Sequence, residues 1–216
     1  MAPQRLAERL AAIRGLLLDW DGVFNGGAKG DGTASTFSEA DSMGLNLLRF
    51  GLWQMQGREL PVAAIVTGED NPSARLFATR ERFHALYRGV RNKRRALEAL
   101  CAAHGLAPAE LICIFDDVND LAMASDCGIR VLVRRRASPS LQEYVAARAL
   151  CDYITAHEAD RHAIRETAEL LLELMGSFET VIGSRIAFDD DYARYFAARQ
   201  AVSTELVEEI GAGPAP

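Results

Sequence analysis

The sequence lacks long hydrophobic runs and shows no targeting segment. None of its apolar stretches approaches the roughly 18–20 residues that a membrane-spanning helix requires. The opening residues MAPQRL do not form the apolar core of a secretory signal peptide. We therefore expect the protein to remain in the cytoplasm, without a membrane partner.

Cysteine and histidine are too few and too scattered to predict a zinc site. None of the four cysteines is spaced like a metal-binding pair, and His157 and His162 do not fall on one helix face. Cys113 and Cys151 lie in expected strands. We interpret the cysteines as reduced residues of a cytosolic protein.

An excess of positive charge is also missing. The net charge is −6, so no overall basic field attracts nucleic acid. The net charge does not exclude a local basic cleft. Arg-rich segments occur at residues 91–95 and 134–136, and we interpret most of these side chains as a solvated helix start and a solvated loop. With 216 residues, 49% of them hydrophobic, the chain can fill one α/β core but not two large domains.

Short apolar runs alternate with amphipathic segments along residues 3–175. The pattern predicts strands at residues 16–19, 62–66, 84–87, 111–115, 129–133 and 151–155. Helices are expected at residues 3–13, 41–56, from 72, 92–104, from about 138 and 158–175. The second of these has Asp41 or Ser42 as its cap, with Leu45, Leu48, Leu52 and Met55 inside. Such alternation indicates an α/β fold with a doubly wound parallel sheet.

Two segments stand apart from this alternation. The glycine-rich stretch 25–32 predicts a flap-like β-hairpin over about residues 23–37, because no helix begins directly after it. Beyond Gly176 the composition changes to a connector at 177–188 and an acidic helix start at 189–191. We therefore expect a core at residues 1–176 and a helical extension at 177–216, whose aromatic side packs on the body or on a neighbouring subunit: Tyr192, Tyr195, Phe196 and Arg199.

The first strand ends in two carboxylates, Asp19 and Asp21, followed by Gly22. In extended chain, residues i and i+2 point to the same side, so these two carboxylates can address one bound group. Adjacent carboxylates repel unless they share a proton or bind a cation, and Mg²⁺ suits hard oxygen ligands. Alone, this Asp-x-Asp-Gly motif fits an ordinary turn equally well.

Further reactive side chains follow other expected strands or begin a helix. Thr67 ends the second strand, Lys93 lies at a helix start, and Asp116 and Asp120 follow the strand at 111–115. Ligands bind where the carboxyl ends of parallel strands meet, so these groups are expected to converge there. Together they supply what phosphoryl transfer requires: a nucleophile, a proton-transfer carboxylate, a hydroxyl, an ammonium and a metal-binding acid.

In order and spacing these motifs resemble the haloacid dehalogenase (HAD) superfamily of phosphatases. The resemblance covers about residues 14–175. It lies in four motifs: Asp19-Trp20-Asp21-Gly22, Ile65-Val66-Thr67-Gly68, Lys93, and Asp116-Asp117-Val118-Asn119-Asp120. It implies a Rossmann-like core.

The resemblance implies two catalytic residues. Asp19 would attack phosphorus to form an aspartyl-phosphate, and Asp21 would act first as an acid and then as a base. It also implies Mg²⁺ as the cofactor, held by the Asp19 side chain, the Asp21 backbone carbonyl and Asp116. The remaining residues would bind phosphate, namely Thr67, Gly68 and Lys93, or would orient waters or Lys93 from outside the metal's ligands, namely Asp117 and Asp120.

The intervals between motifs leave no room for a lid domain. Capless members of this kind are similar to the 3-deoxy-D-manno-octulosonate 8-phosphate phosphatase group, which shares the pattern of Phe37, Asp41 and Gly44. That group implies a homotetramer in which a neighbour's flap closes each site. Two arginines usual in the group are replaced by Ala40 and Glu69, which puts an octulosonate or sialic acid substrate in question.

Phe115 also replaces the glycine that usually precedes the fourth motif, which could reshape the pocket. From these residues we expect an Mg²⁺-dependent phosphatase of a small phosphorylated metabolite, a sugar phosphate or sugar-acid phosphate. Two alternatives remain. One is a non-catalytic oligomerisation or regulatory module, and the other is a phosphatase of a macromolecular substrate that uses the open capless site.

Overall fold

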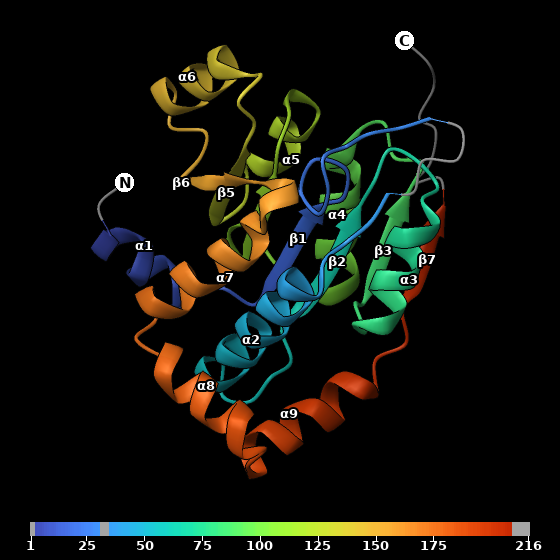
Figure 1. The fold of residues 1–216 in the computed structure, drawn as a ribbon. Coiled ribbons are helices and arrows are strands. Elements are labelled where there is room, and N and C mark those ends of the chain that lie inside the picture. The colour runs from blue at the N-terminus through green and yellow to red at the C-terminus, as the bar shows by residue number, and fades with distance from the viewer. Residues whose placement is uncertain (1–2, 31–34, 209–216) are drawn as a thin grey trace.

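A computed structural model describes residues 3–30 and 35–208 of the chain, which form one α/β unit around a single sheet (Figure 1). All paired strands run parallel, in the order β6-β5-β4-β1-β2-β3-β7. The strands are β1 Gly15–Asp19, β2 Val62–Val66, β3 Ala85–Arg88, β4 Leu111–Phe115, β5 Ile129–Arg134, β6 Tyr153–Glu158 and β7 Glu205–Glu208. This confirms the predicted parallel α/β architecture.

Helices cover both faces of the sheet, which explains why β1 and β4 are buried along their whole length and are apolar except for Asp19 at the end of β1. The helices are α1 Pro3–Leu10, α2 Glu39–Met55, α3 Pro72–Arg80, α4 Lys93–His104, α5 Leu121–Ala124, α6 Pro139–Ala147, α7 Ala163–Leu174, α8 Phe178–Ala187 and α9 Asp190–Gln200. One hydrophobic cluster includes Leu48 of α2 and Leu171 of α7, and another includes Leu100 of α4 and Val145 of α6. The sheet is therefore doubly wound.

Within the described residues no cap domain interrupts the core, since only α2 lies between β1 and β2 and only α3 between β2 and β3. The same part of the chain contains no helix long and apolar enough to cross a membrane.

The start of α2 differs from its prediction. The helix begins at Glu39, and Ser38 is its N-cap, because the Ser38 hydroxyl accepts a hydrogen bond from the Asp41 amide at 3.0 Å. Met55, expected inside, is 37% exposed at the last turn. The other three expected core residues of this helix are buried: Leu45, Leu48 and Leu52.

The region around β6 begins later than predicted. β6 starts at Tyr153, which pairs with Val131, so Cys151 precedes the strand and is only partly buried. α7 starts at Ala163 rather than at 158, because a short 3-10 helix and the left-handed residue His162 (φ 66°) come before it. The sequence pattern placed the strand start at 151 and the helix start at 158, both too early.

The segment predicted as a β-hairpin forms no paired strands in its described residues, 23–30 and 35–37. Instead, the chain turns sharply so that the Phe24 amide donates to the Trp20 carbonyl at 3.0 Å, and side chains tie it to Ser35. Because glycine has no side chain, a glycine-rich segment has little with which to pack a strand. Hydrogen bonds from other side chains organise this loop instead. The expected tip, residues 31–34, lies outside the described residues.

The chain beyond Gly176 packs onto the core. Where a connector was predicted, α8 forms, and that prediction was wrong because Val181 is its single buried residue and leaves little periodic signal. α9 begins as predicted, with the Asp189 carboxylate accepting from the Tyr192 amide at 2.9 Å. Tyr192 and Tyr195 are buried against Phe50 of α2, which confirms that the aromatic side packs on the body. β7 then adds a seventh strand beside β3, which was not predicted.

Candidate active site

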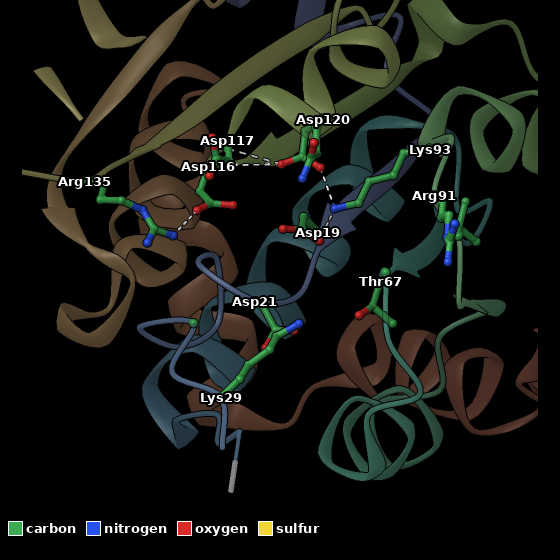
Figure 2. A pocket seen from close by; sticks show the side chains of 14 residues that line it. Asp19, Asp21, Lys29, Thr67, Arg91, Lys93, Asp116, Asp117, Asp120 and Arg135 are labelled. Atoms are coloured by element: carbon green, nitrogen blue, oxygen red, sulfur yellow. Dashed lines mark hydrogen bonds and ion pairs between the residues drawn. The ribbon is translucent and has the colours of Figure 1, made fainter. Parts of the chain in front are cut away.

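A cleft of about 490 Å³ opens at the carboxyl ends of the central strands. Asp19 at the end of β1 and residues from the loops after β1, β2, β3, β4 and β5 line it, together with Lys93 at the start of α4 (Figure 2). Eight predicted site residues line this cleft: Asp19, Asp21, Thr67, Gly68, Lys93, Asp116, Asp117 and Asp120. Parallel topology therefore gathers residues that are about a hundred positions apart in sequence.

The Lys93 ammonium lies between two carboxylates. Its Nζ is 2.5 Å from Oδ1 of Asp19 and 2.5 Å from Oδ1 of Asp120, and all three side chains are buried. Burial disfavours the charged form of Lys93, but Asp19 and Asp120 outweigh that effect and raise the pKa of its ammonium. Lys93 thus remains a fixed positive charge at the base of the cleft.

The acidic side chains are crowded. Asp19, Asp116 and Asp120 each present a carboxylate oxygen, and these oxygens lie within 4.8 Å of one another. Burial raises the pKa of Asp19 well above its ordinary value, and the Asp120 charge adds to the rise. Burial also raises the pKa of Asp116, against the effect of its hydrogen bond from Arg135. Even with the Lys93 ammonium nearby, the three carboxylates therefore carry more negative charge than the positive charge beside them can balance.

The loop after β4 shapes the cluster through its own hydrogen bonds. The Asp117 carboxylate caps the short helix Val118–Asp120 by accepting from the Val118 amide at 2.6 Å. The Asp120 carboxylate in turn accepts weakly from the Asp116 and Asp117 amides, at 3.4 and 3.3 Å. Asp120 therefore holds both the loop and Lys93, and Asp117 supports the loop.

Asp21 lies on the opposite wall from the acidic cluster, held by other groups (Figure 2). Its carboxylate accepts from Ser35 Oγ at 3.0 Å and lies 3.2 Å from Lys29 Nζ. Ser35 Oγ itself accepts hydrogen bonds from the Trp20 indole N–H at 2.8 Å and from the Asn25 side-chain Nδ2 at 2.9 Å. The carboxylate predicted for proton transfer thus has a fixed orientation, set by a residue that sequence reasoning did not single out.

Thr67 and Gly68 both line the cleft, and Thr67 lies on the side that Arg91 also lines (Figure 2). The Thr67 amide donates to the Tyr87 carbonyl at 2.8 Å, and the Thr67 carbonyl accepts from the Val90 amide at 3.1 Å. These backbone bonds fix Thr67, only 1% exposed, where β2 ends. Its hydroxyl accepts a long bond from the Glu69 amide, at 3.3 Å, and can donate to a ligand.

Gly22 is required where the first motif meets the fourth. Its φ of +90° is a conformation that favours glycine, and a Cβ there would lie 2.1 Å from Oδ2 of Asp116. The absence of a side chain therefore lets the Asp116 carboxylate approach β1. The glycine of the Asp-x-Asp-Gly motif has a packing role that the turn interpretation alone would not predict.

Three cationic residues that sequence reasoning did not assign to the site also line the cleft: Lys29, Arg91 and Arg135. Arg135 forms an ion pair with Asp116, so interpreting residues 134–136 as a solvated loop was wrong for this side chain. The available signal was its position just after β5, at the same edge of the sheet. Arg91 belongs to the basic segment before α4, and it too faces the cleft (Figure 2).

The donor set fits a hard divalent cation. Asp19, Asp116 and Asp120 provide only oxygen atoms, and their crowding in a buried place is costly without added positive charge. Asp19 and Asp116, but not the Asp21 side chain, belong to this group. The predicted contribution of Asp21 is its backbone carbonyl, and that role stays a prediction.

No protein-family model matches the chain, and no curated protein matches it. Its fold, however, matches solved structures. A putative HAD superfamily (subfamily III A) hydrolase from Legionella pneumophila is 27% identical, with a TM-score of 0.69 over 85% of this chain and 94% of that one. A 3-deoxy-D-manno-octulosonate 8-phosphate phosphatase from Yersinia pestis is 26% identical, with a TM-score of 0.66 over 81% of this chain and 89% of that one.

A third similar structure was determined with ligands. It is the 3-deoxy-D-manno-octulosonate 8-phosphate phosphatase from Moraxella catarrhalis in complex with a magnesium ion, a phosphate ion and a KDO molecule. It is 24% identical, with a TM-score of 0.68 over 83% of this chain and 97% of that one.

Proposed function

We propose that this chain, a HAD-type hydrolase in its fold and in its resemblance to solved structures, is a phosphatase of small phosphorylated metabolites. One observation carries the proposal: Lys93 Nζ lies 2.5 Å from Asp19, inside a cleft that also holds Asp116 and Thr67. A buried carboxylate beside an ammonium and further acids at a sheet edge suits a nucleophile that attacks phosphorus.

In the first step, an Asp19 carboxylate oxygen forms a bond to phosphorus, and the bond from phosphorus to the substrate's ester oxygen breaks. Asp21 donates its proton to the leaving oxygen, which departs as an alcohol. Ser35 and Lys29 hold the Asp21 carboxylate in place for this transfer. Lys93 and Thr67 bind the phosphoryl oxygens, whose charge shifts during the transfer.

In the second step, Asp21, now ionised, takes a proton from a water molecule that attacks the aspartyl-phosphate. The new bond from water oxygen to phosphorus forms as the bond to Asp19 breaks, which releases inorganic phosphate and restores both carboxyl groups. Because hydrolysis is divided into two displacements, the same two carboxyl groups, those of Asp19 and Asp21, serve in both steps.

A divalent cation, for which Mg²⁺ is the best fit, would be held by the Asp19 and Asp116 side chains and the Asp21 backbone carbonyl. Asp120 stands beside that set and binds Lys93. When bound, the cation supplies positive charge to the phosphoryl group and to the crowded carboxylates. Asp117 and Asp120 support the loop that carries Asp116.

The substrate class is a sugar phosphate or sugar-acid phosphate. Two similar structures are named 3-deoxy-D-manno-octulosonate 8-phosphate phosphatases, and the cleft of about 490 Å³ is in the range for a small ligand. Arg91 and Arg135 supply cationic groups in the cleft, whereas Ala40 and Glu69 occupy positions where that group usually has arginine. A homotetramer remains part of the proposal, and light scattering of the purified protein tests it.

The test is phosphate release from a panel of sugar phosphates, sugar-acid phosphates and nucleotides, with and without Mg²⁺. Asp19→Asn should abolish turnover, whereas the control Asp126→Asn, which changes a carboxylate paired with Arg94 outside the cleft, should retain it. If folded wild type that binds Mg²⁺ releases phosphate from no compound, the non-catalytic module or a macromolecular substrate becomes the better hypothesis.

A further inference from the structure

The guanidinium of Arg135 already occupies one side of the Asp116 carboxylate. Arg135 Nη2 donates to Oδ2 of Asp116, whose side chain is only 3% exposed, while the Arg135 side chain is 37% exposed. Figure 2 shows Arg135 reaching Asp116 from the side opposite Asp19 and Lys93. A buried acid proposed to bind the cation therefore already has a cationic partner from this chain.

The backbone around Arg135 is well anchored. Arg134 donates from its amide to Thr155 Oγ1 at 2.9 Å, and the Arg136 amide donates to Glu158 at 2.8 Å. The Arg135 carbonyl accepts from the Ser138 amide at 3.0 Å. The backbone around Arg135 is thus held by bonds that do not involve the Arg135–Asp116 pair.

A second cavity, of about 210 Å³, lies on the other side of Arg135. Arg135 lines both this cavity and the cleft, so it is part of the wall between them. The second cavity also contains two carboxylates that offer the guanidinium alternative partners: Asp160, and Glu158, which already pairs with the exposed Arg136 side chain at 3.4 Å and would share a second cation. Space and opposite charge are therefore both available next to the position that Arg135 occupies.

We propose that Arg135 is a built-in counter-ion of Asp116 that competes with the divalent cation, and that the cavity lined by Glu158 and Asp160 receives the displaced guanidinium. This inference rests on the proposed cation site at Asp19 and Asp116. Arg135 is a positioning residue in this scheme, since it acts through Asp116. In the metal-free protein it pairs with a buried carboxylate that lies beside two other acids.

The competition has a simple electrostatic origin. A guanidinium and a divalent cation on the same carboxylate repel each other, and the repulsion is strong where water is largely excluded. Cation binding therefore includes the cost of breaking or stretching the Arg135–Asp116 pair. Carboxylates in the second cavity reduce that cost by offering the guanidinium another ion pair.

The direct test is calorimetric titration of Mg²⁺ into metal-free full-length protein. Arg135→Gln should bind Mg²⁺ more tightly than wild type, by about 3- to 30-fold for loss of one nearby like charge. Arg135→Lys keeps the charge and should stay closer to wild type. The matched control Arg148→Gln, whose exposed side chain lies over the Tyr144 ring and lines neither cavity, should change the affinity less than about twofold.

Asp160→Asn provides a test of opposite sign. Removal of a receiving carboxylate should weaken Mg²⁺ binding, by about two- to fivefold for the loss of one exposed charge. Melting temperature gives an independent readout. Metal-free Arg135→Gln should melt below wild type because Asp116 loses its partner, and saturating Mg²⁺ should raise its melting temperature by more than it raises that of wild type.

Unchanged or weaker Mg²⁺ binding in Arg135→Gln would overturn the competition. If wild type binds Mg²⁺ and releases phosphate but Arg135→Gln shows no gain in affinity, this inference alone fails. If wild type neither binds Mg²⁺ nor hydrolyses any phosphate ester, both the proposed function and this inference fail.

Discussion

Lys93 and Asp19 form a buried ion pair with 2.5 Å between Nζ and Oδ1. The two residues are 74 positions apart, one at the end of β1 and the other at the first residue of α4. The same ammonium also contacts Asp120, so a single positive charge serves acids from two strand ends. Removing it leaves buried carboxylates without a partner, which makes Lys93 a sensitive position for both activity and stability.

The first prediction concerns Lys93. Lys93→Gln should lower kcat/KM for phosphate release by about 100-fold or more, because a phosphate-binding charge and the partner of the nucleophile are lost together. The control Arg94→Gln, on the same helix, removes a half-exposed charge and should change kcat/KM by less than about twofold from the wild-type value. Circular dichroism establishes that both variants are folded. An activity of Lys93→Gln equal to that of Arg94→Gln would rule out this role.

The second prediction concerns Ser35, which orients Asp21. Ser35→Ala removes the 3.0 Å hydrogen bond to the Asp21 carboxylate and leaves the Trp20 indole N–H without its acceptor. We expect kcat to fall about 10-fold, with KM little changed, because a misplaced proton donor affects the transition state more than binding. Steady-state kinetics separates the two parameters. An effect on KM alone would show that Ser35 shapes the loop without positioning Asp21.

The third prediction concerns pH and His84. Burial, helped by the charge of Arg49, lowers the pKa of His84 from 6.5 to about 4, and His84 Nδ1 accepts from the Ala63 amide at 3.1 Å. Between pH 6.5 and about 4, His84 binds a proton in the unfolded state but stays neutral in the folded state. The associated stability is thus complete above pH 6.5 and is lost progressively as the pH falls toward 4.

The lost stability should be on the order of 1–3 kcal/mol at pH 4. Urea unfolding at several pH values measures it. His84→Asn, which cannot titrate in this range, should show a smaller decline than wild type. A decline in His84→Asn as large as that of wild type would assign the pH dependence to other groups.

The fourth prediction concerns the packing of the C-terminal helices. Tyr195 is fully buried between Phe50 and Trp53 of α2, and its hydroxyl donates to the Asn46 carbonyl at 3.1 Å. Tyr195→Ala should reduce the free energy of unfolding by about 3–5 kcal/mol, as removal of a large buried ring does. Phe188→Ala, at a ring that is 51% exposed, should cost about 1 kcal/mol or less.

A single unfolding transition that shifts in Tyr195→Ala would show that the extension and the core unfold together. A separate, low-stability transition would instead support a division near residue 176 into core and extension.

Prediction from the pattern of residues succeeded where the signal is local. An unbroken apolar run followed by carboxylates identified β1, and an apolar run of the same kind identified β4. Parallel strands buried on both faces have to be apolar throughout, and polar groups can appear only where the strand ends. The convergence of Asp19, Thr67 and Asp116 then followed from sheet topology.

Prediction failed where a structure depends on distant partners. α8 has one buried residue and β7 forms only because β3 offers a free edge, so neither has a clear local pattern. The flap was expected to pair as strands, yet its described part is held by Ser35. These features depend on which side chains meet after the chain folds.

The sequence alone determined the alternation of strands and helices through β6 and α7 and the reactive groups at the strand ends, because burial and chain direction act on neighbouring residues. Only the tertiary structure decided the partners of those groups: Ser35 for Asp21, Arg135 for Asp116 and Lys93 for Asp19. Such pairs depend on distances of a few ångströms between residues far apart in the chain. Packing of the whole protein sets those distances, since hydrogen bonds and ion pairs weaken steeply with separation and exposure.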